Sequence, residues 1–276
     1  MRVLVIGAGN VGAEVARHLT DRGDHVVATT TTPSRVPEVE AVATEAEVLL
    51  GSDREAVSRA AAGSDAIVVT VSPPVTKAMT ADQREASYRE VLAATCENAV
   101  AANPRTIFFS SISVYGDAAG EITEETPLTR DRDPSGRWFA AAEDAVLSSP
   151  SGAVLRAPDI YGHPNDIDFT TRVRFAHSHF GGSVPFDAEA TFNRLHHLDA
   201  VGAVVHLLDE GLSGVFNAVP PATWGTNGEV FDLLADQAGL AGLEFRGELA
   251  TPTGAISSQK LVDSGFEFSH VEESVE

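Results

Sequence analysis

The chain has very little cysteine and lysine. Its one cysteine, Cys96, excludes an internal disulfide and a zinc site built on cysteines. We therefore expect a reducing, cytoplasmic setting. Lysine occurs only at Lys77 and Lys260, and the other basic residues are arginines. Against 40 acidic residues, this scarcity of lysine indicates either a salt-adapted cytoplasm or simply an acidic protein from a GC-rich genome.

Positive charge and long hydrophobic runs are also missing. With a formal net charge of −21, the chain lacks the basic field by which proteins bind nucleic acid or anionic lipid. No apolar run approaches the roughly 20 residues of a membrane span, and the first one, Val3–Ile6, is too short for a signal peptide. We expect no nucleic-acid or membrane partner. Apolar residues form 43% of the 276 positions, enough for one large domain or one and a half.

The N-terminus carries the most informative pattern. The apolar run Val3–Ile6 is typical of a strand buried on both faces of a parallel sheet. Gly7, Gly9 and Gly12 follow at G-x-G-x-x-G spacing, and residues 13–22 predict a helix. Strand, glycine turn and helix in this order form the dinucleotide-binding fingerprint. The alternative, a tight turn in an α/β domain without a nucleotide, is less favoured by this context.

Each glycine has a distinct task in such a turn. Gly7 allows the tight turn, Gly9 lets the backbone approach a pyrophosphate, and Gly12 lets the helix pack close to the strand. The start of the helix, with Asn10 and Val11, offers free N–H groups and a partial positive charge to the pyrophosphate. We therefore predict that these five residues contact the cofactor.

The second strand, expected over residues 25–32, bears on the choice of cofactor. A NAD-specific site would place an acidic residue near its end, to bond the ribose 2′-hydroxyl. Here Thr30 and Thr31 stand at that place, and Arg35 follows. Hydroxyls and a guanidinium suit a 2′-phosphate, so the sequence favours NADP over NAD. The alternative is that Arg35 is a solvated loop residue and the threonines are ordinary strand formers.

Alternating apolar runs and helical segments predict a doubly wound parallel sheet. The expected elements are, in order, a strand over 47–50, a helix over 54–62, a strand over 66–71, a helix over 81–102 and a strand over 106–109. Val71, Ser72 and Pro73 end one of these strands, at the edge where ligands bind in such folds. We expect them to line the cofactor site. Asp53 either reaches the adenine or caps a helix.

The fifth strand runs into SSISVYG, residues 110–116. With the N-terminal glycine turn, this segment resembles the extended short-chain dehydrogenase/reductase family, the NAD-dependent epimerase/dehydratase group. Four later segments resemble the family in the same order: LRAPDIYG, FNRLHHLDAVGAVVHLL, GVFNAV and SSQKLVDSGFEF. The resemblance implies a Rossmann sheet, NAD or NADP as cofactor, and cofactor contacts from Ser110 and Ile160.

The same resemblance implies a division into two parts. Residues 1–158 would form the dinucleotide-binding Rossmann domain, to which residues 192–219 return. Residues 159–191 and 220–276 would form a small substrate-side lobe. A homodimer through the helices over 81–102 and 135–147 would follow the family pattern.

The chain departs from the family where the chemistry would lie. The resemblance implies a catalytic Ser111, four residues before Tyr115, and a Tyr-x-x-x-Lys pair on the following helix. That pair is absent, because neither lysine follows a tyrosine by four positions. Ser135 or Gly136 falls at the tyrosine place. This loss resembles the atypical branch of the extended family.

Other side chains then become candidates for the proton transfer. Ser111 can donate a hydrogen bond to a developing oxyanion, and Tyr115 or Tyr161 could donate a proton. A histidine could do the same at neutral pH. The histidine candidates are His163, His177, His179, His196 and His197. We expect no metal site, because no carboxylate completes these histidines at a fixed spacing.

Three arginines in the expected lobe could hold an anionic substrate group or form surface ion pairs: Arg172, Arg174 and Arg194.

Together the patterns predict an NAD(P)-binding oxidoreductase or epimerase. It would act by hydride transfer on a small or nucleotide-linked hydroxy or keto compound, with Ser111 and Tyr115 as catalytic residues. The alternative is a non-catalytic NAD(P)-binding sensor or scaffold.

Overall fold

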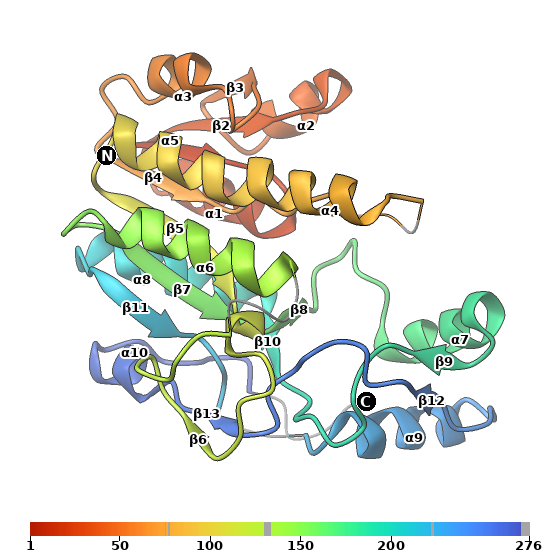
Figure 1. The fold of residues 1–276 in the computed structure, drawn as a ribbon. Coiled ribbons are helices and arrows are strands. Elements are labelled where there is room, and N and C mark those ends of the chain that lie inside the picture. Colours follow the sequence, from red (N-terminus) through yellow and green to blue (C-terminus); the bar gives the residue numbers. More distant parts are fainter. Residues whose placement is uncertain (75, 77, 130–133, 222–223, 272–276) are drawn as a thin grey trace.

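One parallel sheet forms the body of the molecule (Figure 1). The computed structural model describes residues 1–276 except 75, 77, 130–133, 222–223 and 272–276. The sheet has seven strands in the order β11-β7-β5-β4-β1-β2-β3. Their bounds are β1 Arg2–Ile6, β2 His25–Thr30, β3 Glu45–Val48, β4 Ala66–Val69, β5 Thr106–Ser111, β7 Ala153–Ala157 and β11 Gly214–Asn217. Every pairing in this sheet is parallel. The expected doubly wound α/β fold is confirmed.

The winding of the sheet reverses at β1. This strand pairs with β2 on one side and with β4 on the other, so the chain winds outward in both directions. In such sheets, ligands bind beyond the carboxyl ends of the strands at the point of reversal. The glycine turn follows β1 directly and therefore lies at this point.

Helices cover both faces of the sheet (Figure 1). Val15 and Val204 belong to the core cluster on one face, and Val57 and Cys96 to that on the other. Cys96 is fully buried and acts as a packing residue. The helices of the first face are α1 Asn10–Asp21, α2 Val36–Glu40 and α8 His197–Asp209, and those of the second are α3 Arg54–Ala60, α4 Ala81–Tyr88, α5 Thr95–Ala102 and α6 Pro134–Leu147.

The long helix expected over residues 81–102 is present but contains a π turn. The π-helical segment Arg89–Ala94 joins α4 to α5. A π turn takes one residue more than an α turn, so residues on its two sides change face relative to an unbroken α-helix. Tyr88 stands at the junction and is half-buried.

A smaller layer of structure lies beyond the carboxyl end of the sheet. Its own apolar cluster includes Val173, Phe192, Phe231 and Leu234. Its elements are the helices α7 Phe169–Phe180 and α9 Asn227–Gln237 and three two-stranded pairs: β8 Asp159–Tyr161 with β10 Arg194–His196, β9 Ser183–Val184 with β12 Glu244–Phe245, and β6 Glu121–Ile122 with β13 Ala255–Ile256. We call α7, α9, β9 and β12 the lobe.

Two other groups of residues pack within the body of the molecule. Leu261, in the short helix α10 (Gln259–Asp263), and Phe266 belong to the main core cluster. Ala140 and Ala142 of α6 are fully buried within the chain. These alanines therefore pack inside the molecule. The division into two domains and the homodimer remain predictions.

Several boundaries also shift. The α1 helix begins at Asn10, three residues early, because Gly7 has a φ of +100° and turns the chain into the helix at once. β3 begins two residues early; it is an edge strand with mostly exposed side chains, so no hydrophobic pattern marks it. In the part of the chain that the structure describes, no helix has the length and hydropathy of a membrane span.

Candidate functional site

The glycine turn has the geometry of a nucleotide-binding turn. Gly7 has a φ of +100°, a conformation that residues with a side chain rarely adopt. A Cβ atom at Gly12 would overlap the carbonyl oxygen of Gly7 and the hydroxyl of Thr70. Gly12 is thus required for the close packing of α1 on the turn, as its spacing predicts.

Two threonines hold this turn, a role that the sequence analysis assigned to neither of them. The Thr29 hydroxyl accepts a hydrogen bond from the Gly7 N–H at 3.1 Å, and the Thr70 hydroxyl donates to the Gly7 carbonyl at 2.8 Å. Both threonines follow apolar runs that end at the same sheet edge. That shared position is the sequence signal from which their role could have been found.

The start of α1 is open to a ligand. Gly9 is the N-cap residue, no side chain caps the helix, and no acidic residue stands in its first turn. The first N–H groups of a helix lack an intrahelical partner, and here these include the N–H groups of Asn10 and Val11. A Cβ atom at Gly9 would meet nothing within 4 Å. The turn therefore fits a pyrophosphate, with space above Gly9 and free donors beside it.

Arg35 lies against the glycine turn. In the 3₁₀ turn Pro33–Arg35, its Nη2 donates to the Ala8 carbonyl at 3.1 Å and its Nε to Glu38 at 3.0 Å. The side chain is 43% exposed, so the guanidinium can still meet a ligand. Thr30 is buried and its hydroxyl accepts from Thr32 N–H. The neighbouring Thr31 is exposed.

The other expected cofactor contacts lie at the same edge. Val71 follows β4 and would touch a Cβ atom placed on Gly7, so it borders the turn. Ser72 is exposed and Pro73 half-buried. Ile160, in β8, is half-buried against the main core. Asp53 caps α3 by accepting from the Ala56 N–H at 3.0 Å, which supports the capping alternative.

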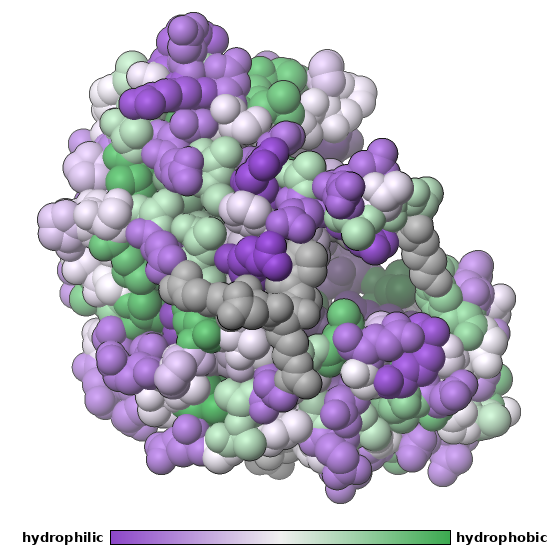
Figure 2. Space-filling view, in the orientation of Figure 1, coloured by the Kyte–Doolittle hydropathy of each residue, from purple (hydrophilic) through white to green (hydrophobic). Residues whose placement is uncertain are grey.

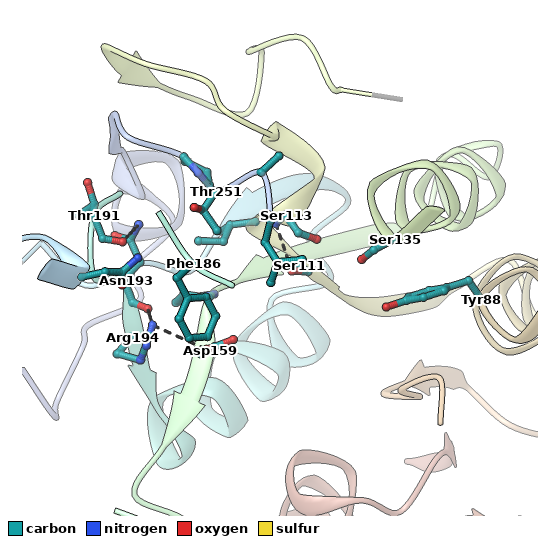
Figure 3. A pocket seen from close by; sticks show the side chains of 16 residues that line it. Tyr88, Ser111, Ser113, Ser135, Asp159, Phe186, Thr191, Asn193, Arg194 and Thr251 are labelled. Atoms are coloured by element: carbon teal, nitrogen blue, oxygen red, sulfur yellow. Dashed lines mark hydrogen bonds and ion pairs between the residues drawn. The ribbon is translucent and has the colours of Figure 1, made fainter. Parts of the chain in front are cut away.

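A pocket of about 260 Å³ opens at the carboxyl end of β5 (Figure 3). On the face drawn in Figure 2, the surface is hollowed between the sheet body and the lobe. The Ser111 hydroxyl accepts from the Ser113 N–H at 3.1 Å, and the Ser113 Oγ is buried with no partner among the described residues. The pocket is lined by Tyr88, Ser111, Ile112, Ser113, Ser135, Pro158, Asp159, Phe186, Thr191, Asn193, Arg194, Asn227, Leu249, Ala250, Thr251 and Pro252.

Tyr115 does not lie in this pocket. It is fully buried, its hydroxyl donates to Asn217 Oδ1 at 2.6 Å, and the same oxygen accepts from Arg156 at 2.9 Å. Burial raises the pKa of the phenol, while the Arg156 guanidinium opposes that shift. The expectation that Tyr115 donates a proton to a substrate is not met by this geometry, because the hydroxyl is enclosed within the protein.

Ser110 is also committed to the interior. Its hydroxyl donates to Glu143 at 2.6 Å, and Glu143 forms an ion pair with Arg156 at 2.7 Å. The expected cofactor contact of Ser110 is therefore not open to its side chain. Glu143 and Arg156 were missed by the sequence reasoning, although a glutamate in an alanine run and an arginine within a buried strand are the signals of such a pair.

Tyr88 is the tyrosine that lines the pocket. Figure 3 shows its ring extending from α4 toward Ser135 and Ser111. Ser135, one of the two residues that the family resemblance aligns with the catalytic tyrosine, lines the pocket too. The third tyrosine, Tyr161, contributes instead to a second depression.

The histidines form a separate group. His196 stacks on His270 at 4.3 Å and lies 4.7 Å from the ring of His197, which in turn contacts His163. Burial, together with the neighbouring His270, lowers the pKa of His196 to about 4. Burial likewise lowers the pKa of His197. His163 and His196 line a depression of about 490 Å³ with Tyr161, away from Ser111.

Although these rings are in contact, no three histidine, cysteine or acidic side chains of the described residues are arranged so that they could hold a metal ion. The other two histidines of the sequence analysis lie on α7, where His177 bonds to the Ala241 carbonyl at 2.9 Å and His179 stacks on Phe175. None of the five lines the pocket at Ser111.

Arg194 is a buried cation at the edge of the pocket. Its side chain is 9% exposed, its Nη1 donates to the Asn193 carbonyl at 2.7 Å, and Asp159 lies 3.7 Å away. The guanidinium lies 3.7 Å from the centre of the Phe192 ring. Burial lowers the pKa of this guanidinium. Its Nε is buried and has no partner among the described residues.

Known proteins resemble the chain in sequence. The profile of a family described as NAD(P)H-binding matches residues 7–151. Protein YeeZ of Escherichia coli strain K12 is 30% identical over 286 residues, which cover 98% of this chain and 96% of YeeZ.

Solved structures share the fold. WbmG of Bordetella bronchiseptica, in complex with NAD, superposes with a TM-score of 0.78 at 18% identity, over 100% of this chain and 91% of WbmG. UDP-glucose 4-epimerase of Thermotoga maritima, with UDP-glucose, gives 0.76 at 18% identity, over 99% and 95%. At these identities the similarity shows a common architecture.

Proposed function

The chain belongs to the NAD(P)H-binding family and has the fold of the NAD-dependent epimerases and dehydratases; from this premise we propose that it is an NAD(P)-dependent oxidoreductase or epimerase. Its substrate would be a small or nucleotide-linked hydroxy or keto compound. One observation carries the proposal: the pocket with Ser111 opens at the carboxyl end of β5, on the same edge of the sheet as the glycine turn, which follows β1 two strands away.

The cofactor proposal rests on the fit of the turn. Gly7, Gly9 and Gly12, with the N–H groups of Asn10 and Val11, would hold the pyrophosphate. Arg35, placed against Ala8, would meet a ribose 2′-phosphate and favour NADP over NAD. A bound nicotinamide supplies or accepts the hydride.

Ser111 would polarise the substrate oxygen. Its oxygen accepts from the Ser113 N–H, so its own proton remains free to point into the pocket. A hydrogen bond to the carbonyl oxygen stabilises the negative charge that develops as the carbon receives a hydride. Ser113 also lines the pocket, but its hydroxyl oxygen is buried, so this role falls to Ser111.

Tyr88 would supply the proton. It lines the pocket together with Ser111, whereas the hydroxyl of Tyr115 is enclosed. In a reduction, the Tyr88 hydroxyl gives its proton to the substrate oxygen while the adjacent carbon gains the hydride, and the phenolate regains a proton from solvent. The product is the alcohol.

The first experiment is a fluorescence titration with NADPH and NADH, at low and at molar salt. NADPH is expected to bind more tightly. Turnover of a panel of small ketones and keto acids is then compared for the wild type, Ser111→Ala and the exposed control Ser148→Ala. We expect Ser111→Ala alone to lower kcat, with NADPH affinity unchanged. Failure of both cofactors to bind folded protein would overturn the proposal.

The second candidate is a non-catalytic NAD(P)-binding sensor or scaffold. The absent Tyr-x-x-x-Lys pair favours it. It predicts that Ser111→Ala changes no property of the protein in the presence of NADPH. Any cofactor-dependent turnover that Ser111→Ala abolishes would exclude it.

A further inference from the structure

A second chamber of about 400 Å³ adjoins the pocket at Ser111. Asp159, Phe186 and Arg194 line both spaces, so the two chambers meet at these side chains. Figure 3 shows Phe186 and Arg194 side by side on the lobe side of the pocket. A substrate seated at Ser111 can therefore extend past Arg194 into the second chamber.

Most side chains of the second chamber are apolar. Phe175 and Phe180 are 44% and 37% exposed and lie in contact with each other, so they form an exposed apolar patch. Apolar ligand chambers with a few placed polar groups are typical of binding sites for small molecules. Its apolar lining consists of Phe175, Ala176, Phe180, Val184, Pro185, Phe186, Phe231 and Leu243.

Its backbone offers few groups for reading a nucleotide base. One wall of the chamber consists of β12, the residues that follow it, and the segment 182–186. The N–H groups of β12 and of the following residues already donate to carbonyl groups of that segment. The donors are the N–H groups of Glu244, Arg246, Gly247, Glu248 and Leu249. A base edge needs hydrogen-bond partners, and burying it unpaired is costly. An alkyl or aryl group has no such requirement.

The charged groups of the chamber favour an anion. Three arginines line it, Arg172, Arg194 and Arg246, in a chain of net charge −21. Two carboxylates lie there as well: Glu248 pairs with Arg246 at 3.4 Å, and Asp159 lies 3.7 Å from Arg194, so the arginines outnumber the carboxylates by one. Arg194 is the one at the meeting point, and its buried Nε has no partner among the described residues. A carboxylate at the meeting point would interact with the exposed part of this guanidinium, whose present carboxylate partner, Asp159, lies 3.7 Å away.

We propose that the substrate is an amphipathic acid, with its apolar body in the second chamber and its carboxylate on Arg194. Its hydroxy or keto group would then lie against Ser111. This inference rests on the proposed function for the reacting group, but the binding of the apolar acid can be measured without any turnover.

The test is calorimetric titration of the whole protein with saturated carboxylates from butanoate to decanoate, with and without NADPH. We expect the Kd to fall about fourfold for each added methylene until the chamber is filled. Octanamide, which has no charge, should bind at least tenfold more weakly than octanoate. UMP and UDP should neither bind as tightly nor compete with octanoate.

Variants locate the site. Arg194→Gln should weaken octanoate binding at least tenfold. Arg174→Gln is the matched control, because Arg174 lies on α7 but lines a different depression, and it should change nothing. Ala176→Leu should shorten the preferred chain, because Ala176 lines the chamber. If that variant fails to fold, the chain-length series on the wild type still decides.

The outcomes separate this inference from the proposed function. NADPH binding and ketone reduction without any dependence on chain length would overturn the amphipathic acid and leave the oxidoreductase. Tight, chain-length-dependent binding in a protein that binds neither NADPH nor NADH would support the chamber and overturn the oxidoreductase. If UDP displaced octanoate at a concentration lower than that of octanoate, the ligand of the second chamber would be a nucleotide and not an amphipathic acid.

Discussion

The carboxylate of Glu143 lies 2.7 Å from the guanidinium of Arg156, and neither side chain is more than 4% exposed. This ion pair joins α6 to β7 and also holds the hydroxyls of Ser110 and Tyr115. It therefore fixes the chain on both sides of Ser111 without entering the pocket. Ser110 and Tyr115 thus help to fix the position of Ser111 and do not contact a ligand in the pocket themselves.

Removing one member of this pair should destabilise the protein strongly. Glu143→Ala leaves Arg156 as a buried charge without its partner, at a cost of about 3–5 kcal/mol in the free energy of unfolding. Urea unfolding measures the loss. The exposed Glu97→Ala on α5 is the control and should cost less than about 0.5 kcal/mol. A loss in Glu143→Ala no larger than that of the control would contradict the buried ion pair.

Alanine substitutions at Gly12 and Gly9 should affect different properties, stability in the first case and cofactor binding in the second. Gly12→Ala forces a Cβ atom against the Gly7 backbone, so it should lower the free energy of unfolding by about 1–3 kcal/mol. Gly9→Ala meets open space and should leave unfolding within about 0.5 kcal/mol, yet weaken NADPH binding at least roughly tenfold. Denaturation and cofactor titration on the two variants give the comparison. Equal effects on both properties would argue against a pyrophosphate above Gly9.

Arg35 should determine the choice of cofactor. Arg35→Ala removes the cation that would meet the 2′-phosphate, so NADPH binding should weaken about 10- to 100-fold, from charge-assisted hydrogen bonds of roughly 1.5–3 kcal/mol. NADH binding should change less than about twofold, since NADH has no such phosphate. Arg54→Ala, on the exposed surface of α3, should affect neither. Parallel losses for both cofactors would place Arg35 away from the phosphate.

Tyr88 should act in catalysis and not in cofactor binding. Tyr88→Phe keeps the ring and removes the hydroxyl, so kcat should fall about 10²-fold or more while the Kd for NADPH stays unchanged. Tyr161→Phe is the matched control, because Tyr161 lines another depression. Full activity of Tyr88→Phe on a substrate that Ser111→Ala no longer turns over would remove Tyr88 from the mechanism.

The pKa of His196 predicts a loss of stability in acid. Its pKa falls from 6.5 to about 4 on folding, so the folded state binds fewer protons than the unfolded one. The contribution of neutral His196 to the free energy of unfolding is fully present above pH 6.5. It is lost as the pH falls from 6.5 toward 4, because the unfolded state then binds a proton that the folded state does not. His196 Nδ1 also accepts from the Leu198 N–H at the start of α8, a bond that protonation would break. His196→Asn can keep this cap.

Urea unfolding between pH 7.5 and pH 4.5 tests this contribution. The variant His196→Asn should lose less stability than the wild type over that range. The difference between the two proteins isolates His196 from the acidic residues, which titrate in both. Identical pH profiles would show that His196 does not carry the effect.

The buried strands could be read from the sequence because continuous apolar runs mark them. Val3–Ile6 and residues 66–69 are fully or almost fully buried, and both were expected as strands. The bounds of the edge strand β3 could not be predicted correctly, because most of its side chains are exposed and form no apolar run. Local pattern thus suffices where both faces of a strand pack, and fails at the edge of the sheet.

The site was only partly readable for a related reason. The spacing of the glycines determines the turn by local geometry, and the turn has the expected form. The hydroxyl of Tyr115 depends instead on Asn217, a partner 102 residues away. Spacing places Tyr115 near the pocket but cannot say which way its ring points. Tyr88 packs against the core cluster of one face and also lines the pocket, and its spacing in the helix does not indicate the second contact.

The π turn makes the length of a helix part of the site. Deleting one residue from the segment Arg89–Ala94 would restore α-helical winding and rotate the preceding helix by about 100° around its axis. Tyr88 would leave the pocket although every side chain near it was retained. A one-residue deletion in this segment would therefore remove the tyrosine from the pocket without replacing it.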